Sequence, residues 1–339
     1  MKKHFFQQFG GKVTKELEAR YAQSPNWKGG SFQNLEHTSL NANLWDIPKI
    51  LYKQLTNSRA RRPAEPLPMP PFDAAAFLAP SEQSQFIWYG HSAILMRLAG
   101  QTLLIDPMLG PDTTPIAPSP NPRFSEGTID FIDAFPTIDL MLITHDHYDH
   151  LDHASIQKLK AKTKRYFVAL GVKRHLVHWG VAPDLITEFD WWEQQVHHGI
   201  AITFTPTRHF SGRGLTDRSK TLWGGWVFQA PHKTIWFSGD GGYGTHFEAI
   251  KRRFGAFELA FMECGQYNDD WRAIHLFPEE AVQAARIAGA QRAVPVHWCG
   301  FDLSYQHTWQ EPANGFVQAA IDQGLDYGLP RLGQLFQAA

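Results

Sequence analysis

The chain has 339 residues, 43% of them apolar, which is enough for one large domain or two small ones around a substantial core. Its formal net charge is −1, so no global basic field indicates nucleic-acid binding. The two cysteines, Cys264 and Cys299, make neither a zinc ribbon nor a disulfide framework, and we interpret them as buried free thiols in a reducing compartment.

Residues 1–6 open like a signal peptide, but polar and glycine residues between Gln7 and Lys12 interrupt the apolar stretch that such a peptide needs. No apolar run approaches the roughly 20 residues of a membrane-spanning helix. We therefore expect a soluble, cytoplasmic protein, and we leave peripheral contact with a membrane open.

Residues 1–80 differ in composition from the rest of the chain. They are polar at first and then rich in proline between Arg62 and Pro71, which is typical of extended, polyproline-like chain. We expect an N-terminal extension that packs on or flanks the main domain, with free disorder as the alternative. The main domain is expected to span residues 81–335.

From Phe86 onward, short apolar runs separated by turns and helical segments predict a series of strands and helices. The predicted strands are 85–89, 93–98, 102–105, 140–144, 166–170, 201–206, 222–229, 234–238, 259–262 and 293–296. The predicted helices are 153–162, 172–179, 244–254 and 278–288.

Four of these strands lead into a side chain that can bind a metal ion. The strand at 140–144 leads to His145, and the strands at 201–206, 234–238 and 293–296 lead to His209, Asp240 and His297. One strand that ends in a polar residue means little, but four of them indicate that neighbouring strands point to one common site.

The densest of these strand ends is residues 144–152, with the sequence THDHYDHLD. Imidazole and carboxylate are the ligands that suit zinc and other first-row metals. A polar, solvated loop with a helix cap is the alternative. Histidine makes up only 17 of the 339 residues, so chance does not account for this density.

Two adjacent metal ions need about six or seven ligands, with open positions left for water and substrate. The chain offers a set of seven: His145, His147, Asp149, His150, His209, Asp240 and His297.

This set resembles the signature of the metallo-β-lactamase fold hydrolases, which is His-x-His-x-Asp-His, a distant His, a Gly-Asp and a last His. The resemblance implies an α/β fold, a four-layer αββα sandwich, with the N-terminal arm added to it. It also implies two zinc ions bridged by Asp240, with manganese or iron as alternatives. The implied ligands of the first metal are His145, His147 and His209. The implied ligands of the second metal are Asp149, His150 and His297.

Further blocks are similar to the phospholipase D branch of this family, which hydrolyses N-acylphosphatidylethanolamine. They are WYGHS at 88–92, LIDP at 104–107, DWWE at 190–193, LWGGW at 222–226, FGAF at 254–257 and HLFPEEA at 275–281. The similarity covers roughly residues 86–320. The chain departs from the branch at Gly241, where threonine is common, at residues 262–267 and at Cys299. These departures lie close to the expected site and leave the substrate open.

By this resemblance, the expected reaction is attack of a metal-bound hydroxide on the phosphorus of an N-acylphosphatidylethanolamine-like lipid. Asp149 and Asp240 are the expected catalytic carboxylates, and Asp240 would position the nucleophile. His275 is the candidate proton donor to the leaving oxygen, and a purely structural role is its alternative. His91 is expected to hydrogen-bond a metal ligand or the Asp106 segment.

The apolar and aromatic content is compatible with a lipid-like substrate. Five tryptophans are candidates for an acyl groove: Trp191, Trp192, Trp223, Trp226 and Trp271. We expect at least three of them in the core instead, because a count of tryptophans cannot separate a groove from a core. His307 is a weaker candidate for the pocket.

The expected partner is a small molecule or a lipid, and three other functions stay open. The first is hydrolysis of a small soluble ester or of a sugar-phosphate lactone, since a fold does not fix a function. The second is a nuclease, against which the near-neutral charge weighs. The third is a non-catalytic metal-binding regulator, against which the intact ligand set weighs.

Overall fold

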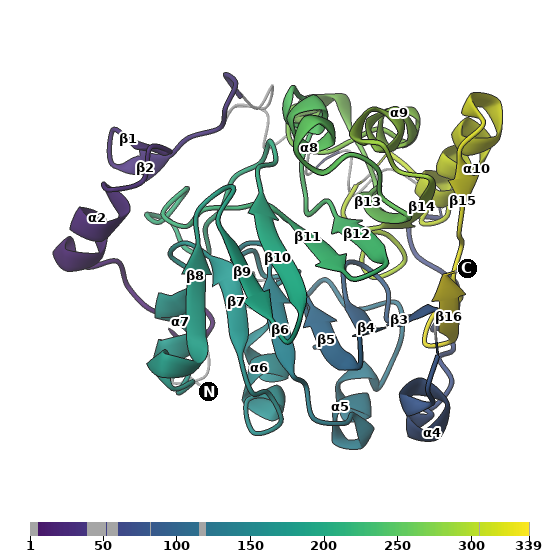
Figure 1. Cartoon of the computed structure of the whole chain (residues 1–339), viewed down its shortest axis with the longest axis horizontal. Coiled ribbons are helices and arrows are strands. Elements are labelled where there is room, and N and C mark those ends of the chain that lie inside the picture. The colour runs from purple at the N-terminus through teal and green to yellow at the C-terminus, as the bar shows by residue number, and fades with distance from the viewer. Residues whose placement is uncertain are drawn as a thin grey trace.

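The computed structural model describes residues 6–38, 52, 60–81, 83–114, 120–304 and 306–338. Two seven-stranded sheets pack face to face, and helices cover the outer face of each sheet (Figure 1). The four-layer αββα sandwich expected from the sequence is confirmed. Of the predicted N-terminal extension, residues 1–5, 39–51 and 53–59 lie outside the described residues.

The first sheet combines antiparallel pairing at one edge with parallel pairing at the other. Its strand order is β16 (Leu335–Ala338), β3 (Ser84–Trp88), β4 (Ile94–Leu98), β5 (Gln101–Ile105), β6 (Leu140–Ile143), β7 (Tyr166–Ala169) and β8 (Ile186–Phe189). The helices on its outer face are α5 (Phe131–Ala134), α6 (His153–Leu159) and α7 (Lys173–His178).

The second sheet repeats this combination. Its strand order is β15 (Asp326–Tyr327), β14 (Arg292–Val296), β13 (Leu259–Glu263), β12 (Lys233–Phe237), β11 (Gly225–Ala230), β10 (Ile200–Thr205) and β9 (Gln194–His197). The helices that cover it are α8 (His246–Phe254), α9 (Pro278–Ala288) and α10 (Glu311–Gln323).

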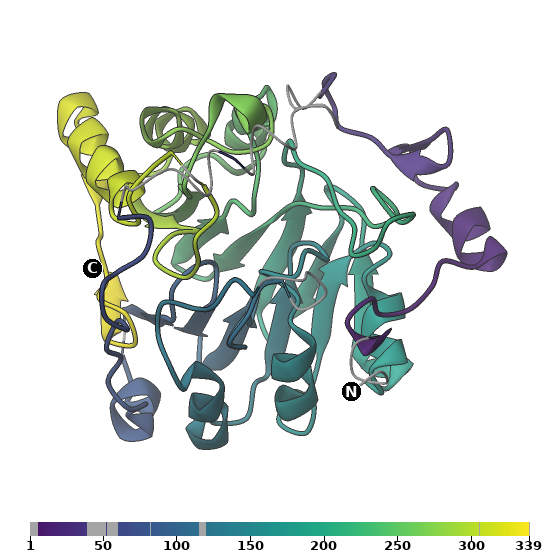
Figure 2. The same ribbon diagram turned by 180° about the vertical axis from the view of Figure 1, so that it is seen from behind.

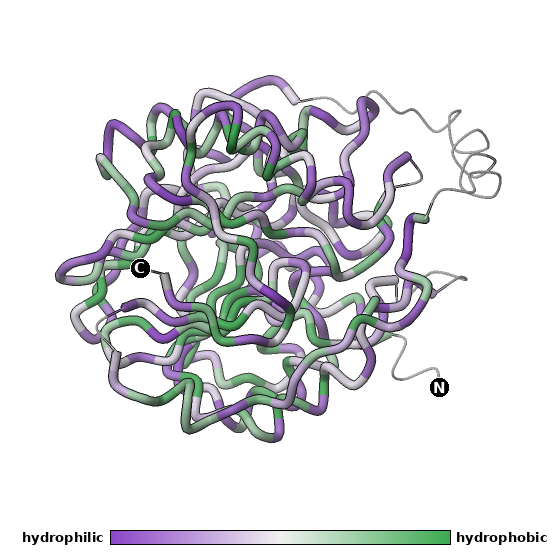
Figure 3. The backbone as a smooth tube through the Cα atoms, turned by 90° about the vertical axis from the view of Figure 1, so that its right-hand side faces the viewer, coloured by the Kyte–Doolittle hydropathy of each residue, from purple (hydrophilic) through white to green (hydrophobic). Residues whose placement is uncertain are grey.

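The main core lies between the two sheets, where the hydrophobic segments of the tube in Figure 3 converge. All four residues of β6 are buried, which is expected of a parallel strand covered on both faces. Phe86 of the first sheet meets Phe261 of the second edge to face, with ring centroids 4.8 Å apart. The strands are therefore fixed firmly enough to position the loops at their ends.

Several elements escaped the sequence analysis. Among them are β8, β9, β15, β16 and α10, besides α5 and the short elements of the N-terminal region. β9 is a mostly exposed edge strand with the sequence QQVH, so it lacks the apolar alternation that marks a strand. β15 has only two residues, and α10 carries a proline and a glycine that weaken a helical pattern. The predicted strand 222–229 begins at Gly225 instead.

The N-terminal arm runs along one side of the sandwich (Figure 2) and contains α2 (Lys15–Tyr21), β1 (Trp27–Lys28) and β2 (Ser31–Phe32). Tyr21 and Phe32 are fully buried and pack with Trp27, with ring centroids 4.9 to 5.7 Å apart. The proline-rich stretch leads to α4 (Ala74–Leu78), whose Phe77 is also buried. Within the described ranges, no helix has the length and apolar character needed to cross a bilayer.

Candidate metal centre

The seven predicted ligands come together where loops from both sheets meet. His145, His147, Asp149 and His150 lie in the loop between β6 and α6, which begins at His153 after the capping residue Asp152. The Asp152 carboxylate accepts hydrogen bonds from two backbone N–H groups of the first helical turn, so the loop ends at a defined point. The other three donors follow β10, β12 and β14 of the second sheet: His209, Asp240 and His297.

Three of these residues, His145, His147 and His209, form what we call the three-histidine cluster. His147 Nδ1 lies 2.9 Å from His145 Nε2 and 3.2 Å from His209 Nε2. Burial and neighbouring imidazoles hold the pKa values of His145 and His209 well below the usual range, and burial lowers the pKa of His147. The cluster therefore presents neutral imidazoles with available lone pairs.

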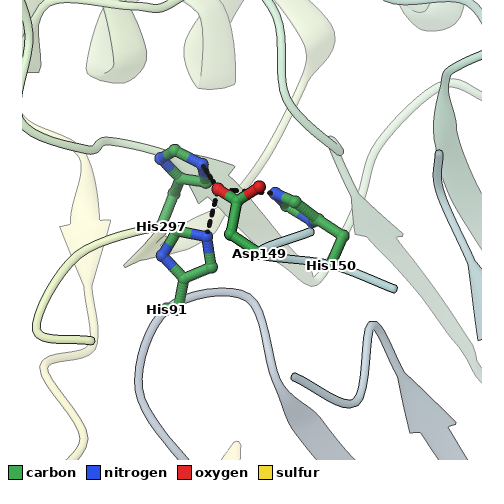
Figure 4. Close-up of side chains that lie close together, drawn as sticks. All are labelled: His91, Asp149, His150 and His297. Carbon is green, nitrogen blue, oxygen red and sulfur yellow. Dashed lines mark hydrogen bonds and ion pairs between the residues drawn. The ribbon is translucent and has the colours of Figure 1, made fainter. Parts of the chain in front are cut away.

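Asp149, His150 and His297 form a second group, which we call the mixed cluster (Figure 4). Asp149 Oδ2 lies 3.7 Å from His150 Nε2 and 3.5 Å from His297 Nε2. His91 Nε2 donates to the same carboxylate oxygen over 2.9 Å, so the contact expected of His91 is present. Burial and the nearby His297 lower the pKa of His91 to about 3.

Asp240 lies between the two clusters. Its Oδ2 atom is 2.9 Å from His297 Nε2 and 3.0 Å from His150 Nε2, and it is 3.9 Å from Nε2 of both His145 and His209. One carboxylate oxygen thus faces both groups of donors.

The protonation of the mixed cluster differs from that of the three-histidine cluster. Burial disfavours a charged imidazole at His297, but the carboxylates of Asp240 and Asp149 outweigh it and raise the pKa of His297 to about 10. The same balance holds the pKa of His150 well above its usual value. Burial likewise opposes ionisation of Asp240, yet His150 and His297 hold the pKa of Asp240 well below the usual range.

Outer hydrogen bonds fix the orientation of several rings. Asp106 is fully buried and accepts from His150 Nδ1 over 2.8 Å, from the Thr144 hydroxyl over 2.6 Å and from the Thr144 N–H over 2.8 Å. His209 Nδ1 donates to the carbonyl oxygen of Ile274 over 3.0 Å. Partners of this kind select the tautomer and direct the other ring nitrogen inward.

The backbone is strained at the same place. His91, Asp106 and His297 have φ values of 54°, 41° and 69°, in the left-handed region that non-glycine residues seldom adopt. A Cβ atom on Gly265 would come within 2.4 Å of His297 Nδ1, so only glycine leaves room for this ring. The surrounding fold holds these residues in place at a local cost, which is typical of a functional site.

The arrangement fits divalent cations. Nε2 of His150 and Nε2 of His297 are buried, and neither has a correctly directed hydrogen bond within the described part of the chain, although both face Asp240. The inward-facing nitrogens of the three-histidine cluster also converge, with His147 Nδ1 within 3.2 Å of the other two. Imidazole and carboxylate donors suit zinc, iron and manganese. The His/Asp clusters are therefore able to bind metal ions.

His275, the predicted proton donor, reaches this site. Its ring stacks on His297 with centroids 5.2 Å apart and meets the edge of His209 at 5.1 Å. Its Nδ1 atom donates over 3.1 Å to Glu263 Oε1. The other carboxylate oxygen of Glu263 accepts the N–H of Leu276 over 2.8 Å, which fixes the orientation of the carboxylate.

A cavity of about 330 Å³ opens above the clusters. His147, Asp149, His209, Asp240, His275 and His297 contribute to it, and the rest of its lining is Phe210, Gln266, Asp270, Trp271, Ile274 and Leu303. Trp271 is thus the one tryptophan of the five candidates that lines this cavity. Trp191, Trp223 and Trp226 are buried in the core, as expected. His307 does not line the cavity, and it stacks on Tyr267 instead.

Glu263 is the main residue of this site that the sequence analysis missed. It is 1% exposed and ends β13, and its Oε1 atom lies 3.6 Å from His297 Nδ1 as well as close to His275. The signal was available, because Glu263 is a further metal-competent side chain at a strand end. The predicted strand 259–262 stopped one residue before it.

The fold and the donor set define a metallo-hydrolase of α/β sandwich type. Residues 101–298, more than half of the chain, match the family model described as "Beta-lactamase superfamily domain". The chain belongs to this superfamily and is one of its metal-dependent hydrolases.

Curated relatives extend this result. The chain is 34% identical over 323 residues to an uncharacterized protein of Mycobacterium tuberculosis, covering 94% of this chain and 86% of the relative. It is 29% identical over 237 residues to the N-acyl-phosphatidylethanolamine-hydrolyzing phospholipase D 1 of Caenorhabditis elegans, covering 66% of each protein. The resemblance to the phospholipase D branch is therefore confirmed at the level of sequence relatives.

Among solved structures, the metallo hydrolase Igni18 of Ignicoccus hospitalis superposes with a TM-score of 0.58 at 19% identity, covering 75% of this chain and 98% of that one. At this identity the similarity supports the fold alone.

Proposed function

We propose that the two clusters hold a pair of zinc ions, with manganese or iron as alternatives. The three-histidine cluster would hold one ion, the mixed cluster would hold the other, and Asp240 would bridge them. Two divalent ions supply a water of lowered pKa and positive charge that offsets an anionic substrate. The buried, inward-facing nitrogens of His150 and His297, both beside the Asp240 carboxylate, support this assignment.

The substrate we propose is a phosphodiester lipid of the N-acylphosphatidylethanolamine type, cleaved as a phospholipase D does. The observation that carries this proposal is the cavity wall, where Phe210, Trp271, Ile274 and Leu303 face the clusters and can contact an acyl chain. The phospholipase D named among the relatives supports the same reaction. A lipid substrate also implies peripheral contact with a membrane.

Three side chains have proposed roles in the reaction. Asp240 and Asp149 orient the attacking water through their carboxylate oxygens. His275 gives a proton to the leaving oxygen, since its ring lines the cavity and Glu263 occupies its Nδ1 side, which leaves Nε2 for the substrate. Fully buried Glu263 keeps the His275 ring in this orientation.

The test is a direct assay with the purified, zinc-loaded chain. N-acylphosphatidylethanolamine in mixed micelles should yield phosphatidic acid, and His275→Gln should lower kcat by roughly 10²-fold while zinc content is unchanged, the range expected for general acid catalysis. His307→Gln is the control, because His307 lies outside the cavity. A folded, zinc-loaded chain that releases no phosphatidic acid would refute the lipid substrate.

A second candidate is a small soluble ester or a sugar-phosphate lactone. The cavity volume of about 330 Å³ favours it, because this lies at the small end of ligand pockets and holds only part of a lipid. Faster turnover of a soluble ester than of any phosphodiester on the same preparation would select this alternative.

A further inference from the structure

The N-terminal arm reaches the candidate metal centre through one side chain, Asn34. Its Nδ2 group donates to the carbonyl oxygen of His209 over 2.8 Å, and its Oδ1 atom accepts the N–H of His209 over 3.0 Å. The indole N–H of Trp223 donates to the same Oδ1 atom over 3.1 Å. One amide side chain, 175 residues away in sequence, thus satisfies both backbone polar groups of His209.

His209 needs such support because of its place in the chain. It lies beyond Thr205, where β10 ends, so no strand pairing fixes its backbone. In the described part of the chain, the His209 backbone N–H and carbonyl group have their hydrogen bonds with Asn34. The ring has its own contact through Nδ1 to Ile274, which sets its rotation. Asn34 therefore fixes the position of the His209 backbone from which the ring projects. The carbonyl group of Ile274 determines which ring nitrogen faces inward.

The residues of the arm that follow Asn34 contact the loop that carries His209 as well. The Arg208 guanidinium donates to the Thr38 hydroxyl over 3.0 Å and to the His37 carbonyl oxygen over 2.9 Å. Glu36 accepts from the N–H of Thr245 over 2.6 Å and from its hydroxyl over 2.8 Å. These contacts tie the arm to the two loops that carry His209 and Asp240.

Upstream, the arm is held firmly enough to position Asn34. The N–H of Phe32 donates to the carbonyl oxygen of Ser219 over 2.9 Å, and Lys220 Nζ donates to the carbonyl oxygen of Gly30 over 2.7 Å. Phe32 is buried between Tyr21 and Trp27. Asn34 follows Phe32 by two residues and so has a fixed starting point.

We propose that Asn34 is a positioning residue of the metal centre and that the N-terminal arm is a working part of the catalytic unit. Asn34 holds the His209 backbone where Nε2 of the ring points into the three-histidine cluster. This inference rests on the proposed function, in which His209 is a metal ligand. It places a residue from outside the matched family region, 101–298, in control of a donor inside it.

The experiment measures zinc binding by the full chain against a competing chelator, with zinc content counted by elemental analysis. In Asn34→Ala, one of the two zinc ions should bind about 10- to 100-fold more weakly, the range found when outer partners of metal ligands are removed. Asn34→Asp keeps the acceptor for the His209 N–H but sets a carboxylate oxygen against the His209 carbonyl oxygen, so it should also weaken binding at the same ion. If Asn34→Ala does not fold, Asn34→Asp decides the matter.

The matched control is Asn26→Ala. Asn26 is another asparagine among the described residues of the arm, and its Nδ2 group donates to Asp190 Oδ1 over 2.8 Å, away from the clusters. Its zinc affinity should equal that of the unmodified chain. Unchanged zinc binding in both Asn34 variants would overturn the inference, and so would equal weakening in Asn26→Ala, which would indicate general loosening of the arm.

His209→Ala separates this inference from the proposed function. If His209→Ala loses one zinc ion while the Asn34 variants bind both normally, only the positioning role is wrong. If His209→Ala itself binds both ions normally, the ligand assignment is wrong, whatever the Asn34 variants do.

Discussion

The three-histidine cluster and the mixed cluster face the same Asp240 carboxylate, yet the chain builds them differently. The first contains only imidazoles with lowered pKa values, and its outer contacts are a hydroxyl group and a backbone carbonyl group. The second contains a carboxylate, has two histidines with raised pKa values, and is backed by two buried carboxyl side chains, Asp106 and Glu263.

This difference indicates two ways to hold a cation. The three-histidine cluster offers lone pairs that are free of protons, which suits zinc. The mixed cluster offers negative charge, but a cation there must first displace protons from histidine. The two clusters should therefore respond differently when the side chains that support one of them are substituted, and they should differ in the protons that they release on metal binding.

The largest effect is expected from Asp240→Asn, which removes the carboxylate that both clusters share. Hydrolytic activity should fall by at least roughly 10³-fold, since the amide neither bridges two cations nor aligns a water between them. Steady-state kinetics with elemental analysis measures this. Activity above a tenth of the original in a folded, metal-loaded variant would show that the clusters work independently of Asp240.

Asp106→Asn should separate the clusters. The amide group cannot accept from His150 Nδ1 and both Thr144 donors at once, so the mixed cluster should bind its cation about 10- to 100-fold more weakly. The three-histidine cluster should weaken less, because Asp106 reaches it only through the Thr144 hydroxyl, which lies 2.9 Å from His145 Nδ1. Zinc titration resolves the two sites.

The control is Asp139→Asn. Asp139 precedes β6 in the first sheet, at the end of the strands opposite to Asp106, and it accepts the N–H of Thr102 and pairs with Lys164. Its zinc titration should match that of the unmodified chain. Equal weakening of both sites in Asp106→Asn would contradict separate backing of the clusters.

The sequence could predict which side chains come together at the clusters but not the contacts that support them. The donors carry a local signal, because four lie within six residues and the others follow strands. The αββα fold followed from the resemblance to the metallo-β-lactamase fold hydrolases, whereas apolar runs such as β6 predicted only the individual strands. Asn34 gave no such signal, because its partner, the His209 backbone, is 175 residues away and is defined only by the folded arm.

A third prediction concerns protons. In the metal-free chain His297, with a pKa of about 10, is protonated at pH 8, and Asp240 and Asp149 raise the pKa of His150 well above its usual value, which favours the same state. Zinc binding to the mixed cluster should therefore release about one to two protons, and the release should decline as pH rises through 10. Binding to the three-histidine cluster should release none, because lowered pKa values leave His145 and His209 neutral.

Calorimetry in buffers of different ionisation enthalpy measures this release. In His209→Ala, which keeps the mixed cluster, the protons should still be released. In His297→Ala, the release should decrease. Equal release from both clusters would remove the electrostatic distinction between them.

The smallest effect is expected from Glu263→Gln, which tests whether the backing of the mixed cluster also serves the reaction. The amide keeps the size of the side chain but weakens the contact to His275 Nδ1 at 3.1 Å and the one to His297 Nδ1 at 3.6 Å. Losing one charge-assisted hydrogen bond of about 1.5 kcal/mol corresponds to about a tenfold lower kcat. If Glu263 acts through His275, KM and zinc content should stay unchanged, and the double variant Glu263→Gln/His275→Gln should be no slower than His275→Gln alone. A loss of zinc with unchanged kcat per bound metal would instead assign Glu263 to the mixed cluster through His297.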